Sequence, residues 1–221
     1  MKDLKTVIFD LDGTILNTLA DLAESMDKAL ALLGYPVHGM DEYRYFVRNG
    51  VTILGERVLP EGNRDDKTRD ALLAVYSKIY AENQMNKTAP YDGVAEAIKR
   101  LKAAGFRVAV LSNKPAPNSR VIVAHYFGDL FDEVRGQCDE FPRKPDPSQA
   151  FDLLEKLGSA PEGSFFVGDS GTDMETSVNA GMTGVGVLWG YRTADELLAK
   201  GAKALAASPA ELADIIINYG K

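Results

Sequence analysis

Two aspartates near the start of the chain, Asp10 and Asp12, stand where the apolar run 6–9 ends, and Gly13 follows them. An apolar, β-branched run is typical of a buried parallel strand, and ligands of open parallel sheets bind beyond the carboxyl ends of the strands. Two carboxylates this close repel each other unless a cation lies between them or one keeps its proton. The pattern favours a functional site over an ordinary Asp-Gly turn, which is the other interpretation of these residues.

Further polar residues follow other apolar runs, and the carboxyl ends of parallel strands meet at one edge of a sheet. We therefore expect the residues after the runs 106–111 and 164–167 to lie near the two aspartates. The expected group consists of Asp10, Asp12, Ser112, Asn113 and Asp169, with Lys144 from a proline-flanked loop. It offers three carboxylates, a hydroxyl and an ammonium. Oxygen ligands without histidine or cysteine suit Mg²⁺. The hydroxyl and the ammonium could hold the oxygens of a phosphoryl group.

The order of the expected elements predicts the fold class. Apolar residues recur at helical spacing over 19–33, from 51 to about 60 and over 64–85, so residues 16–86 are expected to be helical without a strand. From residue 90 onward, strands and helices alternate, which is typical of a parallel sheet. The sequence therefore predicts an α/β protein: a Rossmann-like parallel-sheet core of residues 1–15 and 87–221, with a helical cap domain, 16–86, inserted after the first strand.

Individual elements are expected within that core. Helices are predicted over 94–104, 117–126, 147–157 and 172–180, and a last one begins at Ser208-Pro209. Strands are predicted over 106–111, 131–134, 164–167 and 185–189.

Composition limits the class of protein and its partners. The chain has 221 residues, a formal net charge of −7 and a single cysteine, Cys138. The negative charge argues against nucleic-acid and membrane partners, and no apolar run reaches the roughly 18 residues of a membrane span. We expect a cytoplasmic protein without a signal peptide, a monomer or weak homodimer, whose partner is a small phosphorylated metabolite.

Four motifs in order make the chain resemble the haloacid dehalogenase superfamily of phosphohydrolases. The motifs are Asp10-x-Asp12-Gly13-Thr14, Ser112, Lys144 before Pro145, and Gly168-Asp169-Ser170 with Asp173. Within the superfamily the chain is most similar to phosphoglycolate phosphatases. The segments that carry this similarity are Ser112-Asn113-Lys114-Pro115, Arg143-Lys144-Pro145-Asp146-Pro147 and Trp189-Gly190-Tyr191-Arg192.

The resemblance implies a role for each matching residue. Asp10 would be the nucleophile that forms an aspartyl-phosphate, and Asp12 would be the general acid and base. Asp10, Asp169 and the backbone carbonyl of Asp12 would bind Mg²⁺. Further roles would fall to Ser112, Lys144 and the backbone amides near Asn113 at the phosphoryl group, to Gly13 and Thr14 at the phosphate loop, and to Ser170 and Asp173 in support of the metal loop.

The expected cap carries the segment that the resemblance links to substrate choice. Arg48 and Asn49 fall where the family has its specificity loop, and Asn17-Thr18 stands where many relatives have Asp-Ser. A guanidinium at Arg48 could pair with a carboxylate or with a second phosphate, or it could be an ordinary solvated side chain.

Several functions remain open at this point. Phosphoglycolate is the first candidate substrate, and pyrophosphate, nucleoside monophosphates and sugar phosphates follow. A phosphosugar mutase of the same fold is a weaker alternative because that group usually has another residue at the position of Thr14. Dehalogenation is disfavoured by the acid at Asp12. A phosphate-sensing scaffold without catalysis is the alternative outside enzymes, and the retained acids argue against it.

Overall fold

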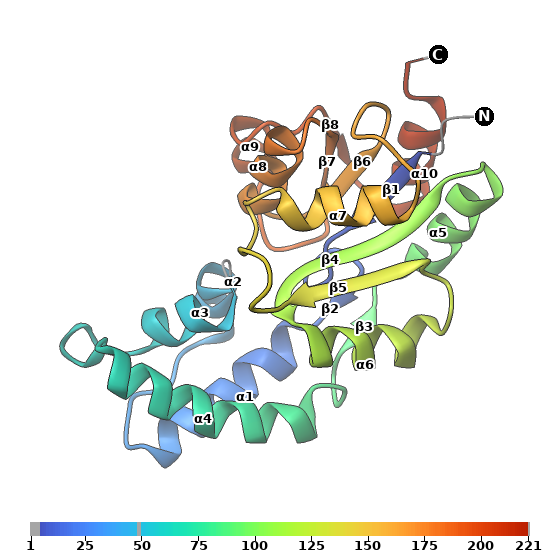
Figure 1. Cartoon of the computed structure of the whole chain (residues 1–221). Coiled ribbons are helices and arrows are strands. Elements are labelled where there is room, and N and C mark those ends of the chain that lie inside the picture. Colours follow the sequence, from blue (N-terminus) through green and yellow to red (C-terminus); the bar gives the residue numbers. More distant parts are fainter. Residues whose placement is uncertain (1–4, 48–49, 221) are drawn as a thin grey trace. The chain divides into compact units, whose positions relative to one another are not determined.

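The structure, a computed structural model, describes residues 5–47 and 50–220. The chain divides into two compact units (Figure 1). Met1–Leu16 and Pro90–Lys221 form an α/β unit, and Asn17–Ala89 forms a helical unit. The chain passes between them at two short strands, β2 (Leu16–Asn17) and β3 (Ala89–Pro90), which pair with each other. Strand β2 corrects the expectation that 16–86 contains no strand, since two residues are too few for periodicity to reveal.

The α/β unit is built on a six-stranded sheet in the order β5-β4-β1-β6-β7-β8, and all of its pairings are parallel. Its strands are β1 (Thr6–Phe9), β4 (Arg107–Pro115), β5 (Glu133–Gln137), β6 (Phe165–Gly168), β7 (Thr183–Val187) and β8 (Ala204–Ala206). Its helices are α5 (Val94–Ala103), α6 (Ala116–Phe127), α7 (Ser148–Lys156), α8 (Gly171–Asn179), α9 (Ala194–Ala199) and α10 (Pro209–Asn218). The expected Rossmann-like parallel sheet is therefore confirmed.

The strand order explains why the polar residues at the strand ends lie close together. From β1 the chain continues to β4 and β5 on one side, and then returns to β6, β7 and β8 on the other side of β1. Such a reversal opens a crevice beyond the carboxyl ends of the central strands. Strands β4, β1 and β6 are neighbours, so the residues at their carboxyl ends lie together.

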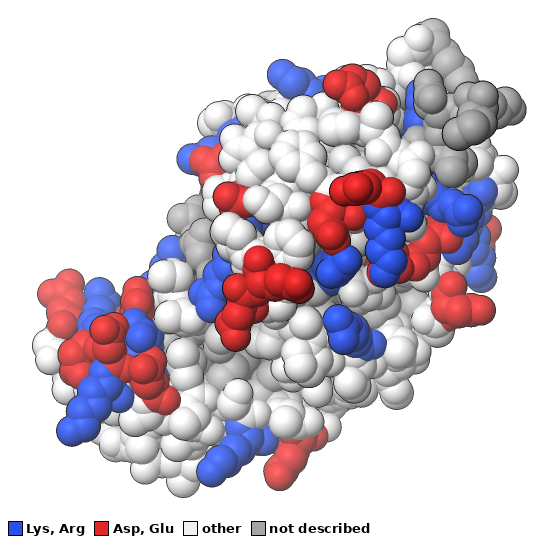
Figure 2. All heavy atoms as spheres, in the orientation of Figure 1, with Lys and Arg blue, Asp and Glu red and all other residues white. Residues whose placement is uncertain are grey.

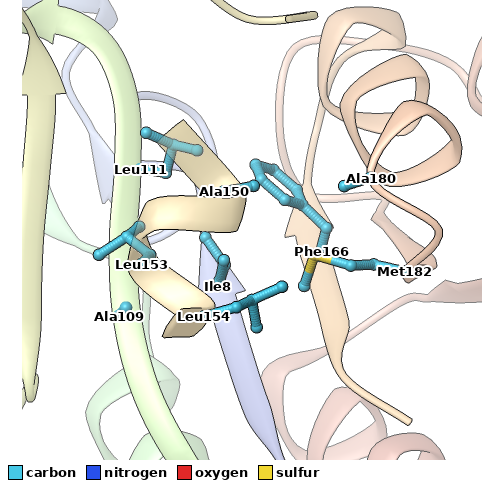
Figure 3. Packing of buried hydrophobic residues seen from close by; sticks show 9 residues of the cluster. All are labelled: Ile8, Ala109, Leu111, Ala150, Leu153, Leu154, Phe166, Ala180 and Met182. Carbon is cyan, nitrogen blue, oxygen red and sulfur yellow. The ribbon is translucent and has the colours of Figure 1, made fainter. Parts of the chain in front are cut away.

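Alternation along β1 sends successive side chains to opposite faces of the sheet. On one face Ile8 packs with Leu153 of α7 and Phe166 of β6, within the cluster drawn in Figure 3. On the other face Phe9 lies with Val94 of α5 and Leu212 of α10. Both faces of β1 are thus apolar, which explains why its sequence lacks polar alternation.

Three features of this unit differ from the sequence expectations. Strand β4 continues through the Ser112–Pro115 segment, although the strand was expected to end at residue 111, and its register is irregular between Leu111 and Pro115. Strand β7 ends at Val187, so Trp189 lies in a turn rather than in a strand. The short elements α9 and β8 were not predicted, because six and three residues show little periodicity.

The helical unit contains α1 (Leu19–Leu32), α2 (Met40–Phe46), α3 (Val51–Val58), the 3₁₀ turn η1 (Glu61–Asn63) and α4 (Asp66–Asn83). Helix α2 lies between the helices expected over 19–33 and from residue 51, where no individual helix was predicted. Its Tyr43 is fully buried and donates a hydrogen bond to Asp27 at 2.5 Å. His38 contacts the rings of Tyr43 and Phe46, so these side chains give a short polar helix an apolar face.

Charged side chains of both signs alternate on the face shown in Figure 2. In the helical unit Arg69 pairs with Glu56, Asp66 and Asp70, at distances of 2.7 to 3.0 Å. Among the helices of the described ranges, none is long and apolar enough to cross a membrane.

Candidate active site

Asp10 follows β1 and is held by an ion pair with Lys144. The Lys144 ammonium donates to Oδ1 of Asp10 at 2.7 Å and to Oδ1 of Asp173 at 2.7 Å. All three side chains are nearly excluded from solvent. The Asp10 backbone N–H donates to the carbonyl of Val167 at 2.8 Å, which extends the pairing of β1 with β6 by one residue. Asp10 is thereby fixed beside the end of β6.

Asp169 and Asp173 come from β6 and from the helix that follows it. Asp169 comes directly after β6, and its Oδ2 accepts from the Tyr191 backbone N–H at 2.7 Å. Asp173 forms a capping box with Ser170 at the start of α8, so its Oδ2 is bound while Oδ1 faces Lys144. The structure therefore assigns Ser170 to the orientation of Asp173.

Asp10, Asp169, Asp173 and Lys144 form what we call the acidic cluster. One carboxylate oxygen from each of its three aspartates lies within 4.8 Å of the other two, close enough to hold a metal ion. When all four groups are ionised, three negative charges face one positive charge, so two negative charges within the cluster are not offset. A divalent cation would supply that charge, and an all-oxygen ligand set suits Mg²⁺.

The pKa shifts in the acidic cluster report the same imbalance. Burial, followed by repulsion from Asp173, raises the pKa of Asp10 to about 7, although Lys144 opposes the shift. Burial, followed by repulsion from Asp173 and Asp10, raises the pKa of Asp169 well above its ordinary value. Burial alone would lower the pKa of Lys144, but Asp10 and Asp173 raise it. The ammonium thus stays charged while Asp10 and Asp169 resist ionisation.

The predicted metal ligands were Asp10, Asp12 and Asp169. The structure groups the side chains of Asp10 and Asp169 with Asp173. The carboxylate of Asp12 instead accepts from the Lys114 ammonium, at 3.1 Å to Oδ1 and 3.4 Å to Oδ2. We call these two residues the Asp12–Lys114 pair. The predicted backbone role of Asp12 at the metal stays a prediction.

Lys114 is the charged residue of the site to which the sequence reasoning gave no role. It is only 6% exposed and lies near the end of β4, beyond the run 106–111 that was expected to form the strand. A signal was present in its spacing: Ser112 and Lys114 are two residues apart, and side chains two apart on a strand share a face.

Ser112 and Asn113 stand on β4 beside the Asp12–Lys114 pair. The Ser112 hydroxyl accepts from the Lys114 backbone N–H at 3.2 Å. The Asn113 side chain binds the backbone of Lys144 twice: its Oδ1 accepts from the N–H at 2.9 Å, and its Nδ2 donates to the carbonyl at 3.1 Å. The side chain of Asn113 therefore positions Lys144, and its backbone amide stays a predicted phosphate ligand.

Gly13 and Thr14 pack against Asp169. Gly13 has φ +87°, and a Cβ there would lie 2.4 Å from Oδ2 of Asp169, so the position requires glycine. The Thr14 hydroxyl donates to Oδ1 of Asp169 at 3.3 Å. Trp189 donates from Nε1 to the Thr14 carbonyl at 3.0 Å, so the late Trp-Gly-Tyr-Arg segment supports the phosphate loop.

Two predicted site residues, Arg48 and Asn49, lie outside the described residues, and their predicted roles stay predictions.

Comparison with known proteins identifies the family. The model of the haloacid dehalogenase-like hydrolases matches residues 4–181. The phosphoglycolate phosphatase of Psychrobacter arcticus is 34% identical to this chain over 88% of each protein. That of Vibrio vulnificus strain CMCP6 is 32% identical, over 98% of this chain and 97% of its own.

A solved structure from Lactobacillus delbrueckii subsp. bulgaricus, provisionally assigned as a phosphoglycolate phosphatase, superposes with a TM-score of 0.93. It is 28% identical and covers 98% of this chain and 99% of its own. The chain belongs to the haloacid dehalogenase-like hydrolases. Within that family it is a phosphatase, so its substrate is a small phosphorylated compound.

Proposed function

We propose that this chain is a Mg²⁺-dependent phosphomonoesterase that uses Asp10 as its nucleophile and phosphoglycolate as its substrate. The observation that supports the mechanism best is the state of Asp10. Its carboxylate is buried, one oxygen is bound to Lys144 at 2.7 Å, and two further carboxylates lie within 4.8 Å. A carboxylate so crowded is expected to need a cation.

The acidic cluster fits Mg²⁺ by charge and by ligand type. Asp10 and Asp169, with the backbone carbonyl of Asp12, would hold the ion, and Asp173 would orient Lys144 and the loop. When bound, Mg²⁺ would offset charge on the phosphoryl oxygens and on Asp10, which lets two anions approach each other.

The first half of the reaction transfers the phosphoryl group to the protein. An Asp10 oxygen attacks phosphorus and forms a P–O bond, while the bond between phosphorus and the leaving oxygen breaks. Asp12 gives its proton to that leaving oxygen, so the product leaves as a neutral alcohol group. Lys144, Ser112 and backbone amides near Asn113 bind the phosphoryl oxygens through the transfer.

The second half releases phosphate. Asp12, now a carboxylate, takes a proton from a water molecule as that water attacks phosphorus. The bond between phosphorus and the Asp10 oxygen breaks, so inorganic phosphate forms and both aspartates regain their starting states.

The substrate is inferred from the relatives. Phosphoglycolate phosphatases from two genera are 32% and 34% identical to this chain over most of its length. The helical unit is proposed to be the cap that selects the substrate, with Arg48 and Asn49 as candidates for recognition. Asn17-Thr18, which stands where many relatives have Asp-Ser, is also proposed to bear on substrate choice. Thr18 is the N-cap residue of α1, the first helix of the helical unit.

The test is a substrate panel at saturating Mg²⁺, ranked by kcat/KM. Phosphoglycolate should rank first, ahead of pyrophosphate, a nucleoside monophosphate and a sugar phosphate. Chelation should abolish turnover, and added Mg²⁺ should restore it. A different substrate at the top of the ranking would overturn the substrate assignment, and full turnover after exhaustive chelation would overturn the metal assignment.

A further inference from the structure

Lys114 carries a buried ammonium that has no role in the phosphoryl transfer proposed above. Its side chain is 3% exposed, and burying an ammonium is unfavourable unless the charge is paired. The nucleophile does not need it, because Lys144 already lies 2.7 Å from Asp10. Lys114 instead binds both carboxylate oxygens of Asp12. The site thus holds two lysines that serve different aspartates.

The position of Lys114 follows from that of Asp12. If Asp12 protonates the leaving oxygen, that oxygen lies within about 3.2 Å of the Asp12 carboxylate during reaction. The Lys114 ammonium is 3.1 Å and 3.4 Å from the two oxygens of the same carboxylate. It therefore lies within about 7 Å of the leaving oxygen.

An anion carried by the leaving group can span that gap. When a carboxylate stands on the carbon next to the leaving oxygen, its own oxygens lie about 3 to 4 Å from that oxygen, given ordinary bond lengths. One of them can then approach the Lys114 ammonium to hydrogen-bonding distance. The Asp12 side chain is 17% exposed, so the Asp12–Lys114 pair borders space that a substrate can enter.

We propose that Lys114 is a specificity-determining residue that binds the carboxylate of the leaving group. This inference rests on the proposed function, because it takes Asp12 as the general acid and an alkyl phosphate with a carboxylate on the carbon that bears the leaving oxygen as the substrate. A substrate without that anion leaves a buried ammonium with one partner fewer, and sites of this kind reject such analogues strongly. The acidic cluster would process any phosphomonoester, and Lys114 would select among them.

The test compares two substrates that differ only in the anion. Phosphoglycolate carries the carboxylate, whereas ethyl phosphate has an equally poor leaving group without it. The variant is Lys114→Met, and Lys114→Gln serves as the second variant because it removes the charge but keeps a donor toward Asp12. The matched control is Lys102→Met, in the same unit, whose ammonium binds the Leu130 carbonyl at 2.7 Å.

The measured quantity is the ratio of kcat/KM for phosphoglycolate to that for ethyl phosphate. Both Lys114 variants should lower this ratio by 10- to 100-fold, on the order expected for one charge-assisted hydrogen bond. Lys102→Met should leave it within about twofold, because the Lys102 ammonium contacts Leu130 and Asp132 rather than Asp12. In the Asp10→Asn background, Lys114→Met should weaken calorimetric binding of phosphoglycolate more than that of ethyl phosphate.

The outcomes separate this inference from the proposed function. A wild-type preference for phosphoglycolate that survives in a folded Lys114 variant overturns the role of Lys114 and leaves the substrate assignment standing. Equal wild-type rates on the two substrates overturn the substrate assignment, and the role of Lys114 with it. A purely structural Lys114 would lower both rates equally and leave the ratio unchanged.

Discussion

The acidic cluster and the Asp12–Lys114 pair lie at the same edge of one sheet, yet their charges are balanced differently. In the acidic cluster three carboxylates face one ammonium, and the pKa values of Asp10 and Asp169 are raised as a result, with burial as the first cause. In the Asp12–Lys114 pair, one carboxylate faces one ammonium. The cluster has an excess of negative charge that a divalent cation can offset. The pair is neutral when Asp12 is ionised and positive when Asp12 carries its proton, so it can bind an anionic group of the substrate.

The largest expected effect concerns the nucleophile of the acidic cluster. Asp10→Asn should lower kcat on every phosphomonoester by roughly 10⁴-fold or more, because an amide cannot form the acyl-phosphate. The fold should persist, which circular dichroism and a melting curve can verify. If the variant keeps a tenth of wild-type turnover, the covalent mechanism is wrong.

Removing Lys144 from the acidic cluster or Lys114 from the Asp12–Lys114 pair should lower the free energy of unfolding by different amounts. Lys144→Met leaves three buried carboxylates without an ammonium and should cost about 3 to 5 kcal/mol of unfolding free energy at neutral pH without metal. Lys114→Met should cost less, about 1 to 2 kcal/mol, because Asp12 keeps contact with solvent. Urea titrations in a chelator measure both values. The reverse order would contradict the charge imbalance assigned to the acidic cluster.

The raised pKa values predict how stability of the metal-free protein depends on pH. Asp10 titrates near 3.8 when unfolded and near 7 when folded, so the native state binds the extra proton. The stability from this proton is complete below pH 4 and is lost as the pH rises toward 7, by about 1.4 kcal/mol per pH unit. Asp169 acts in the same direction.

Mg²⁺ should reverse that pH dependence by stabilising the ionised cluster. Its addition should raise the melting temperature more at pH 8 than at pH 5, since protonated carboxylates bind the ion poorly. Asp10→Asn provides the control, because it removes the contribution of Asp10. An equal Mg²⁺ effect at both pH values would argue against the acidic cluster as the metal site.

The smallest effect concerns the side chain that positions Lys144. Asn113→Ala removes two hydrogen bonds to the Lys144 backbone and should lower kcat about tenfold. The loss should be the same on phosphoglycolate and ethyl phosphate, because the Asn113 side chain binds the backbone of Lys144 and the backbone amide of residue 113 is kept. A change in the ratio of the two rates would instead connect Asn113 to substrate choice.

Local patterns were sufficient to predict the α/β core. The run 6–9 followed by Asp10 indicated a buried strand with acids at its end, and β1 with its parallel neighbours has that form. The elements that were missed are short ones: β2, α2, the 3₁₀ turn η1, β3, α9 and β8. Their formation depends on contacts distant in sequence, such as the burial of Tyr43, which periodicity does not report.

The site residues that follow the ends of strands could be predicted from the sequence. The ion pairs that they form with the lysines could not. Asp10, Lys144 and Asp173 meet in one ion-pair network, although 134 residues separate Lys144 from Asp10. The partner of each lysine could not be deduced, since a lysine in a loop is usually solvated. Lys114 was passed over for that reason, because the strand was expected to end at residue 111, whereas β4 extends to Pro115.

The proposed mechanism depends most on Asp10 as the nucleophile that receives the phosphoryl group, and the Asp12→Asn variant offers a direct test. This variant lacks the group that takes the proton from water, whereas p-nitrophenyl phosphate needs no acid to leave. The measurement is a rapid-mixing assay of nitrophenolate release, followed by acid quench and peptide mass spectrometry. We predict one equivalent of nitrophenolate in a burst and a phosphoryl group on the peptide that contains Asp10. Steady release without a burst, with Asp10 unmodified or another residue phosphorylated, would contradict the mechanism.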